Sequence, residues 1–295
     1  MSFNHKYELV VSETETSGDN QALRIEDLQV EFDVQRSTKS KMNQTKVSVY
    51  NLSESSRNLI KSFEQKNGFI TLSAGYRDSG VSQIFIGNIV KLETFKKDAD
   101  IVTEITCADG HAAVKDSVTN RRFPEKSTLK SIIETIATQD MNLSIGEVLG
   151  KNLNKVFENG LTVEGNSYKY LKNVSEMHQL QLSIQNNSLT VLPNQGTSAR
   201  AAINISKDTG ILGSPQFTGQ SASETSDTKN PKSGIRLDHI LLPSAIPGRI
   251  MIVNSQFASG SYKIESVSHR GSFRGSSWTT SIEGSIVSVD QEEEL

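Results

Sequence analysis

The sequence holds a single cysteine, Cys107, among 295 residues, so it can form no internal disulfide and no cysteine-rich zinc site. No stretch reaches about 18 consecutive apolar residues, the length that a transmembrane helix needs. The first residues, MSFNHKYELVV, lack the long apolar run of a signal peptide. We therefore expect a protein that is made in a reducing cytoplasm, folds without covalent help and has no membrane anchor.

A surplus of either charge is missing as well. The chain has 31 Lys and Arg against 34 Asp and Glu, and its last six residues include four of the acids, Asp290, Glu292, Glu293 and Glu294. The rest of the chain is close to neutral, which argues against sequence-independent nucleic-acid binding and against a polybasic membrane-surface protein. Local groups of basic residues are interpreted as solvated charges beside acids, and they comprise Lys39, Lys41, Lys46, Arg121, Arg122, Lys126 and Lys130.

The signatures of nucleophilic and nucleotide-dependent catalysis are absent. No G-x-S-x-G elbow occurs, GSFRG at 271–275 has the wrong spacing, and there is no Walker or Rossmann glycine pattern. Cys107 lies in an alternating strand pattern, which favours a small buried hydrophobe over a nucleophile. Glu158 and Glu164 would be the acids to propose for a glycosidase pair, but nothing distinguishes them from the other acidic residues.

Metal-binding spacings are absent too. No histidine has an H-x-H or H-E-x-x-H partner, and Asp238 and His239 are expected on opposite faces of a strand. Trp278 shares a strand face with Thr280 and Ile282, which favours core packing, with ligand stacking or an interface role as the alternative. The sequence thus predicts no catalytic, cofactor-binding or metal-binding residue and no cofactor, and the histidines are interpreted as structural: His5, His111, His178, His239 and His269.

What the chain does contain is a succession of β patterns. Within residues 23–34, Leu28, Val30, Phe32 and Val34 alternate with polar residues, which predicts a half-buried strand. The composition of residues 97–100 is typical of a hairpin turn. Further strands are predicted at 46–50, 69–76, 84–95, 101–107, 249–253, 261–269 and 276–287.

Helical patterns are few. A short helix is predicted between Ser53 as N-cap and Gly68 at its end. Two amphipathic helices are predicted at 127–139, with Ser127 as cap, and at 167–179. The Asn186-Asn187 pair then predicts a two-residue hairpin turn, since asparagine tolerates positive φ.

These patterns divide the chain into three predicted domains. A first β domain covers 1–110, a small α+β domain covers 111–193, and a second β domain covers 194–295. The last domain includes the polar segment 218–234, which has no large apolar side chain and is expected to be a flexible loop by itself, and the acidic end. The two β domains share a similar order of strands, loops and turns, although their sequence identity is negligible.

The order of several segments resembles that of the baseplate hub proteins of contractile phage tails, which also occur in phage-derived bacteriocins and secretion spike bases. The resemblance covers about residues 22–287. It rests on these segments, in this order: KVSVYNLSESSRNLI, ITLSAGY, IFIGNIV, ITCADG, STLKSIIETIA, GNSYKYLKNVSEMHQLQLSIQNNSLTVLP, GILGSPQFTG, IRLDHILLPSAIPGRIMI and SYKIESVSHRGSFRGSSWTTSIEG.

The resemblance implies a mainly β fold in which two tube-like antiparallel β-barrel domains flank a small α+β middle domain. It implies a structural homotrimer in the tail baseplate of a virion, assembled in the host bacterial cytoplasm. This homotrimer would be a symmetry adaptor between the hexameric tail tube, or a tube initiator protein, and the central spike protein. A baseplate wedge or tape measure protein would be a further partner, and DNA would pass through a channel without specific binding.

Several alternatives stay open at this point. A stand-alone length with no fused spike after residue 287 favours a phage or bacteriocin hub over a fused secretion spike. A cell-wall hydrolase, or a carbohydrate-binding adhesin with Trp278 in a sugar platform, belongs to another functional class. For the hub, we expect channel-facing positions to be mainly Ser, Thr, Asn, Asp and Glu, with Arg121, Arg122 and Lys126 turned toward protein partners. We also expect a neighbouring chain to order segment 218–234.

Overall fold

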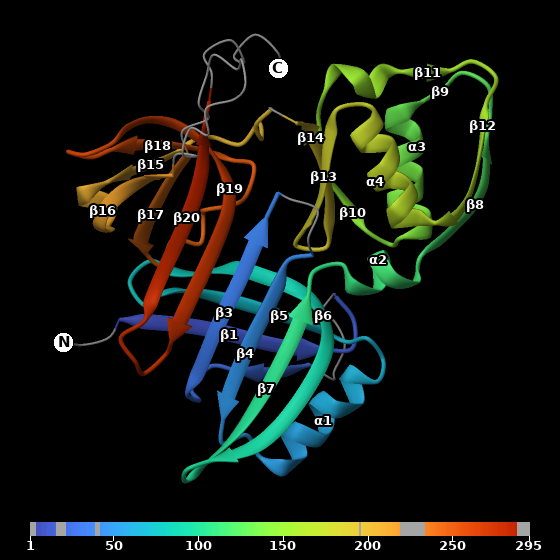
Figure 1. Cartoon of the computed structure of the whole chain (residues 1–295). Helices are drawn as coiled ribbons and strands as arrows, with labels where there is room; N and C mark the ends of the chain where they lie inside the picture. Colours follow the sequence, from blue (N-terminus) through green and yellow to red (C-terminus); the bar gives the residue numbers. More distant parts are fainter. Residues whose placement is uncertain (1–3, 16–21, 39–41, 195, 219–233, 288–295) are drawn as a thin grey trace, which may run out of the picture.

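The computed structural model describes residues 4–15, 22–38, 42–194, 196–218 and 234–287 (Figure 1). Most of the described strands join one 13-stranded sheet, and smaller sheets form in the middle of the chain. The predicted fold class, mainly β with a small α+β insert, is confirmed. The long path of the sheet has the strand order β16-β17-β20-β19-β3-β4-β7-β6-β5-β1-β2.

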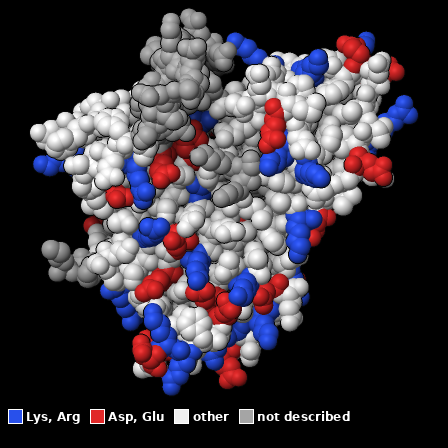
Figure 2. Space-filling model, in the orientation of Figure 1, with Lys and Arg blue, Asp and Glu red and all other residues white. Residues whose placement is uncertain are grey.

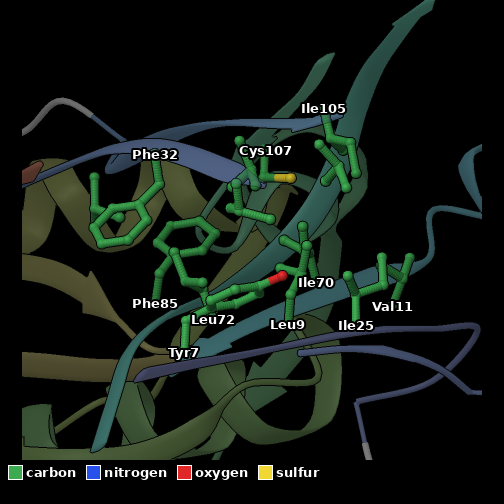
Figure 3. Packing of buried hydrophobic residues seen from close by; sticks show 14 of the residues in the cluster. Tyr7, Leu9, Val11, Ile25, Phe32, Ile70, Leu72, Phe85, Ile105 and Cys107 are labelled. Atoms are coloured by element: carbon green, nitrogen blue, oxygen red, sulfur yellow. The ribbon is translucent and has the colours of Figure 1, made fainter. Parts of the chain in front are cut away.

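The first β region folds into two layers around an apolar core. The long strand β6 belongs to both layers, because its residues 80–88 pair with β5 and its residues 88–97 pair with β7. Between the layers lie fully buried side chains such as Tyr7, Leu9 and Phe85 (Figure 3). The elements of this region are β1 (His5–Ser12), β2 (Leu23–Ile25), β3 (Val30–Ser37), β4 (Gln44–Tyr50), α1 (Glu54–Glu64), β5 (Phe69–Tyr76), β6 (Gly80–Lys97) and β7 (Asp100–Ala108).

The middle region has its own buried cluster, in which two helical segments pack on a three-stranded sheet of order β10-β14-β13. Its helical elements are α2 (His111–Asp116), α3 (Leu129–Thr135), the π-helical turn η1 (Ile136–Asp140), the 3-10 turn η2 (Lys151–Asn154) and α4 (Ser167–Met177). Its strands are β8 (Val118–Phe123), β9 (Ser127–Thr128), β10 (Ser144–Val148), β11 (Val156–Phe157), β12 (Leu161–Asn166), β13 (Leu180–Gln185) and β14 (Ser188–Pro193).

The last region returns to the large sheet and encloses a third apolar cluster, which includes Ile205, Met251 and Ile282. Its elements are β15 (Ile203–Ser206), the 3-10 turn η3 (Lys207–Thr209), β16 (Ile211–Thr218), β17 (Gly234–Ile240), β18 (Ile250–Asn254), β19 (Ser259–Ser272) and β20 (Trp278–Ile286).

The two β regions are joined by one strand pair, β3 with β19, in which Val34 lies opposite His269. Trp278 of β20 extends this joint into the first core, where its Nε1 donates to the carbonyl oxygen of Gly75 at 3.0 Å. This packing requires glycine at position 271 in β19, because a Cβ there would lie 2.2 Å from the ring of Phe32. The large sheet is therefore continuous from one β region into the other.

Several local predictions are confirmed. The amide of Ser56 donates to the N-cap Ser53 Oγ at 3.1 Å. Asp98 has φ of 54° between the paired residues Lys97 and Asp100, as a tight hairpin requires. Asn186 and Asn187 have φ of 55° and 56°, so this turn is the predicted two-residue hairpin.

Other local predictions are wrong in detail. The predicted strand 23–34 is broken, because β2 pairs with β1 in one layer whereas β3 pairs with β4 in the other. The N-cap of the second helix is Thr128 instead of Ser127, and that helix changes to a π-helical turn after Thr135.

At the end of α1, Asn67 and not Gly68 has a positive φ. Gly68 is needed for close approach, because a Cβ there would lie 2.8 Å from the carbonyl oxygen of Ser12. Residues 219–233 of the predicted polar loop and the acidic end lie outside the described residues.

Candidate functional site: a polar sheet face and a buried polar junction

One face of the large sheet is polar across seven neighbouring strands. Directly paired residues share a face, so the register assigns Asp238, Ser281, Ser268, Gln35 and Gln44 to one row across β17, β20, β19, β3 and β4. We call this surface the polar sheet face. Its residues are Arg236, Asp238, Ser281, Glu283, Ser266, Ser268, Arg270, Glu31, Asp33, Gln35, Gln44, Lys46, Ser48, Glu104, Thr106, Lys91 and Glu93.

Charges of both signs alternate on the polar sheet face, which is turned toward the viewer in Figure 2. Six of its residues are acidic and four are basic, and every basic one has an acidic neighbour within ion-pair distance. The pairs are Arg236 with Glu283 at 3.7 Å, Arg270 with Asp33 at 3.2 Å, Lys46 with Glu104 at 2.8 Å and Lys91 with Glu93 at 2.8 Å. Exposed pairs of this kind contribute little to stability, but they leave the face without a continuous positive region.

The polar sheet face is hollowed where the two β regions meet. A concavity of about 680 Å³ lies over β19, β20 and the end of β3. Serine residues and two exposed arginines, Arg236 and Arg270, line it. Most residues of its lining are polar, and Met42 and Val267 are the apolar ones.

A buried polar junction ties the hairpin β13–β14 to the first β region. The backbone amides of Asn186 and Asn187 donate to the two carboxylate oxygens of Asp109 at 2.7 and 2.8 Å. Asn43 Nδ2 donates to the carbonyl oxygen of Ile184 at 2.8 Å, and its Oδ1 accepts from the amide of Ser37 at 2.8 Å. The turn predicted from sequence is thus held at its tip by a single buried carboxylate.

Arg36 completes the buried junction. Its Nε and Nη2 donate to Gln185 Oε1 at 3.2 and 3.1 Å, and its Nη1 donates to the carbonyl oxygen of Ile84 at 3.2 Å. Burial lowers the pKa of Arg36 to about 10, and the charge of Asp109 opposes this shift. Burial raises the pKa of Asp109, while the amide of Asn187 and the charge of Arg36 counteract the rise.

His269 lies beside this junction on the buried side of β19. Its Nδ1 is hydrogen-bonded to Thr280 Oγ1 at 2.9 Å, and its side chain is fully buried. Burial, reinforced by the nearby charge of Arg36, lowers the pKa of His269 to about 3. The imidazole is therefore neutral at physiological pH and has a structural place in the core.

The residues considered from sequence are dispersed. Cys107 is buried in the first core, where burial raises the pKa of its thiol, so it is a small hydrophobe as predicted. Trp278 is 4% exposed and stacks on His5 with ring centroids 4.5 Å apart, which excludes it from an exposed sugar platform. His239 is buried and Asp238 is exposed, as predicted for opposite faces of a strand.

The remaining candidates do not converge either. His111 begins α2, His178 follows the end of α4, and Glu158 and Glu164 are exposed. Among the described residues, no group of three or more His, Cys, Asp and Glu side chains is placed to hold a metal ion. None of the described helices has the length and apolar character needed to cross a membrane.

Sequence reasoning did not single out Arg36, Asn43, Asp109 and Gln185 as a group. One signal was available: in VEFDVQRS the inward positions are Val30, Phe32, Val34 and then Arg36. A charged residue in the inward register of a strand indicates a buried ionic contact, because an isolated buried charge is very costly. Its partners were not readable, since they come from three other strands and turns.

Comparison with known proteins gives a family and a fold. Residues 10–224 match the model of a family described as baseplate hub gp41. A tail protein from Neisseria meningitidis is similar in structure, with a TM-score of 0.64, 8% identity, and coverage of 95% of this chain and 96% of that one. The 43 kDa tail protein of prophage MuSo2 from Shewanella oneidensis has a TM-score of 0.62, 9% identity, and coverage of 95% and 96%.

A protein from E. coli described as a component of the type VI secretion system has a TM-score of 0.59 at 9% identity, over 96% of this chain and 77% of that one. A search of curated protein sequences finds no match. At these low identities the structural similarities concern the fold alone.

Proposed function

Because the chain belongs to the baseplate hub gp41 family, and is thus a structural protein of the phage tail baseplate and not an enzyme, we propose that three copies assemble into a ring. In this ring the two β regions of each chain provide six similar units around one axis. The ring is a symmetry adaptor: it joins the hexameric tail tube, or a tube initiator protein, to the central spike of a contractile tail. A baseplate wedge or tape measure protein is the further partner.

The continuous sheet supports this proposal most directly. A ring with six similar units needs the two β regions of one chain to be held rigidly side by side, and the β3–β19 ladder provides that connection. Three separate buried clusters support the proposed domains 1–110, 111–193 and 194–295. The proposed barrels would complete their sheets against neighbouring copies, so that fewer strand edges are left exposed.

We assign the polar sheet face to the channel wall. A channel for DNA must not hold phosphate, and a wall with many unpaired Lys and Arg would bind it with release of counterions. The polar sheet face has more acids than bases, and its basic residues are ion-paired. Arg121 and Arg122 lie on β8 in the middle region, away from this face. Arg122 is exposed there, whereas the Nε of Arg121 is ion-paired with Asp140 at 2.7 Å.

The first prediction concerns assembly. We expect the purified protein, alone or with its tube protein, to form a three-fold ring, because a structural adaptor functions through its symmetry. Light scattering measures the mass in solution, and negative-stain images of the mixture show the ring. A protein that stays monomeric and forms no ring with its tube protein would contradict the trimer.

The second prediction concerns DNA. We expect the ring to bind double-stranded DNA no more tightly than a neutral protein does, and we expect this weak affinity not to depend on the salt concentration. As a matched comparison, Asp33→Lys, Glu93→Lys and Glu104→Lys together should create salt-dependent binding, because they turn the polar sheet face positive. Electrophoretic mobility shifts at two salt concentrations measure this. Tight salt-sensitive binding by the unchanged protein would refute the channel assignment.

A further inference from the structure

Two arginines of the polar sheet face are each covered by a carboxylate from a neighbouring strand. Asp33 of β3 lies directly opposite Arg270 of β19, and Glu283 of β20 lies directly opposite Arg236 of β17. Arg270 Nε donates to Asp33 Oδ2 at 3.2 Å, and Arg236 Nη1 lies 3.7 Å from Glu283 Oε1. The four side chains are between 37% and 53% exposed, so solutes in water can reach both pairs.

The second oxygen of each carboxylate accepts a hydrogen bond from a serine. Ser268 Oγ donates to Asp33 Oδ1 at 3.4 Å, and Ser266 Oγ donates to Glu283 Oε2 at 3.1 Å. Both serines belong to β19 and line the concavity of the polar sheet face. Each acid therefore bridges one arginine and one serine, and the same arrangement occurs twice on this face.

An arginine beside a serine is a combination of donors that suits a phosphate group. The donors that contact phosphate oxygens in protein–DNA complexes include arginine and serine, and a guanidinium matches carboxylate and phosphate geometry alike. A serine hydroxyl has a single proton, so Ser266 and Ser268 cannot donate to a phosphate while they donate to an acid. Each guanidinium keeps further N–H groups, but the carboxylate beside it offsets its charge and repels a second anion.

We propose that these two arginine–serine pairs are binding sites for a phosphate group, each of which is filled by a carboxylate of the chain itself. We call them the self-filled sites: Arg270 with Ser268, filled by Asp33, and Arg236 with Ser266, filled by Glu283. The sites themselves rest on these contacts, and their use rests on the proposed function. On a channel wall, they allow exposed arginines to be present without retaining DNA.

Two other acids of the polar sheet face provide a matched comparison. Glu93 pairs with Lys91 and Glu104 pairs with Lys46, each at 2.8 Å. Among the described residues, no hydroxyl group donates to either of these carboxylates. Their removal changes the net charge by the same amount as the removal of the two acids in the self-filled sites, but it frees lysines that have no serine placed beside the same acid.

Emptying the self-filled sites tests the proposal directly. The double variant Asp33→Ala with Glu283→Ala removes both carboxylates and leaves the arginines and serines in place. We expect it to bind a labelled single-stranded oligothymidylate about tenfold more tightly than the control variant Glu93→Ala with Glu104→Ala. The unchanged protein should bind more weakly than either variant. Fluorescence anisotropy at low salt concentration measures the three affinities.

The serines separate a built site from a simple change of charge. Adding Ser266→Ala and Ser268→Ala to the emptied variant keeps its net charge and should remove most of the gain in affinity. Exposed ion pairs contribute little to stability, so these variants should fold, and circular dichroism checks this. If the emptied variant is misfolded, Asp33→Asn with Glu283→Gln replaces it, because both changes keep the size of the side chain.

The outcomes distinguish the self-filled sites from the proposed function. A gain no larger than that of the control variant, or a gain that persists without the two hydroxyls, overturns the self-filled sites while the hub role stands. Tight, salt-sensitive binding by the unchanged protein overturns both the self-filled sites and the channel assignment. A protein that binds as expected here but forms no ring overturns the proposed trimer alone.

Discussion

Replacing Asp109 by alanine is expected to lower the free energy of unfolding by about 3–5 kcal/mol. The change removes the acceptor for the amides of Asn186 and Asn187, which stay buried in the junction without partners. It also removes the acidic group that opposes the buried charge of Arg36. Urea unfolding followed by the fluorescence of Trp278, the only tryptophan, measures the loss.

Two further variants serve as comparisons for the destabilisation caused by Asp109→Ala. Glu158→Ala changes an exposed acid and should cost less than about 0.5 kcal/mol. Asp109→Asn keeps one oxygen as acceptor and should fall between the two. If Asp109→Ala were no more destabilising than Glu158→Ala, the carboxylate would not be the group that holds the hairpin tip.

Acidification from pH 6.5 to 3 is expected to remove about 5 kcal/mol of stability through His269 alone, at about 1.4 kcal/mol for each pKa unit. The unfolded imidazole takes a proton near pH 6.5, whereas the folded one does so only near pH 3. Between these values the unfolded state binds more protons than the folded state. The contribution of His269 to stability is therefore complete above pH 6.5 and is lost as the pH is lowered toward 3. Thermal unfolding across this range measures the slope.

The variant His269→Asn isolates this contribution, because its side chain can still bond Thr280 but does not titrate. We expect a flatter pH profile for this variant and an unchanged slope for the control His178→Asn. Asp109 acts in the opposite direction, since burial raises its pKa and so favours the folded state in acid. A profile that His269→Asn leaves unchanged would show that other groups cause the acid sensitivity.

Features set by neighbouring residues were predictable from sequence. The cap at Ser53 and the turn at Asn186-Asn187 depend on side chains within a few positions, and both are present. The prediction missed the break between β2 and β3, although the alternation shifts phase between Ile25 and Leu28, where Glu26 and Asp27 are both polar. Only the pairing of each strand, with β1 or with β4, shows that the chain changes layers there.

In the candidate site, too, local features were predictable from sequence and contacts between distant strands were not. The polar composition of its strands was visible as alternation, and the near-neutral charge of the chain agrees with the balanced pairs on the polar sheet face. The row that places Gln35 beside Ser268 was not, because register between distant strands leaves no local signal. The same holds for the partners of Arg36.

The joint between the two β regions has a consequence for the order in which the chain acquires its structure during synthesis. Trp278 and Gly75 are 203 residues apart, yet the indole packs within the first core and bonds that carbonyl. A nascent chain emerges from the ribosome with its N-terminus first. The contacts of Phe32 with Trp278 and of β3 with β19 can therefore form only when synthesis is nearly complete. Contacts of such high sequence separation form slowly, and a chain stopped before β19 would expose apolar surface and a free strand edge prone to aggregation.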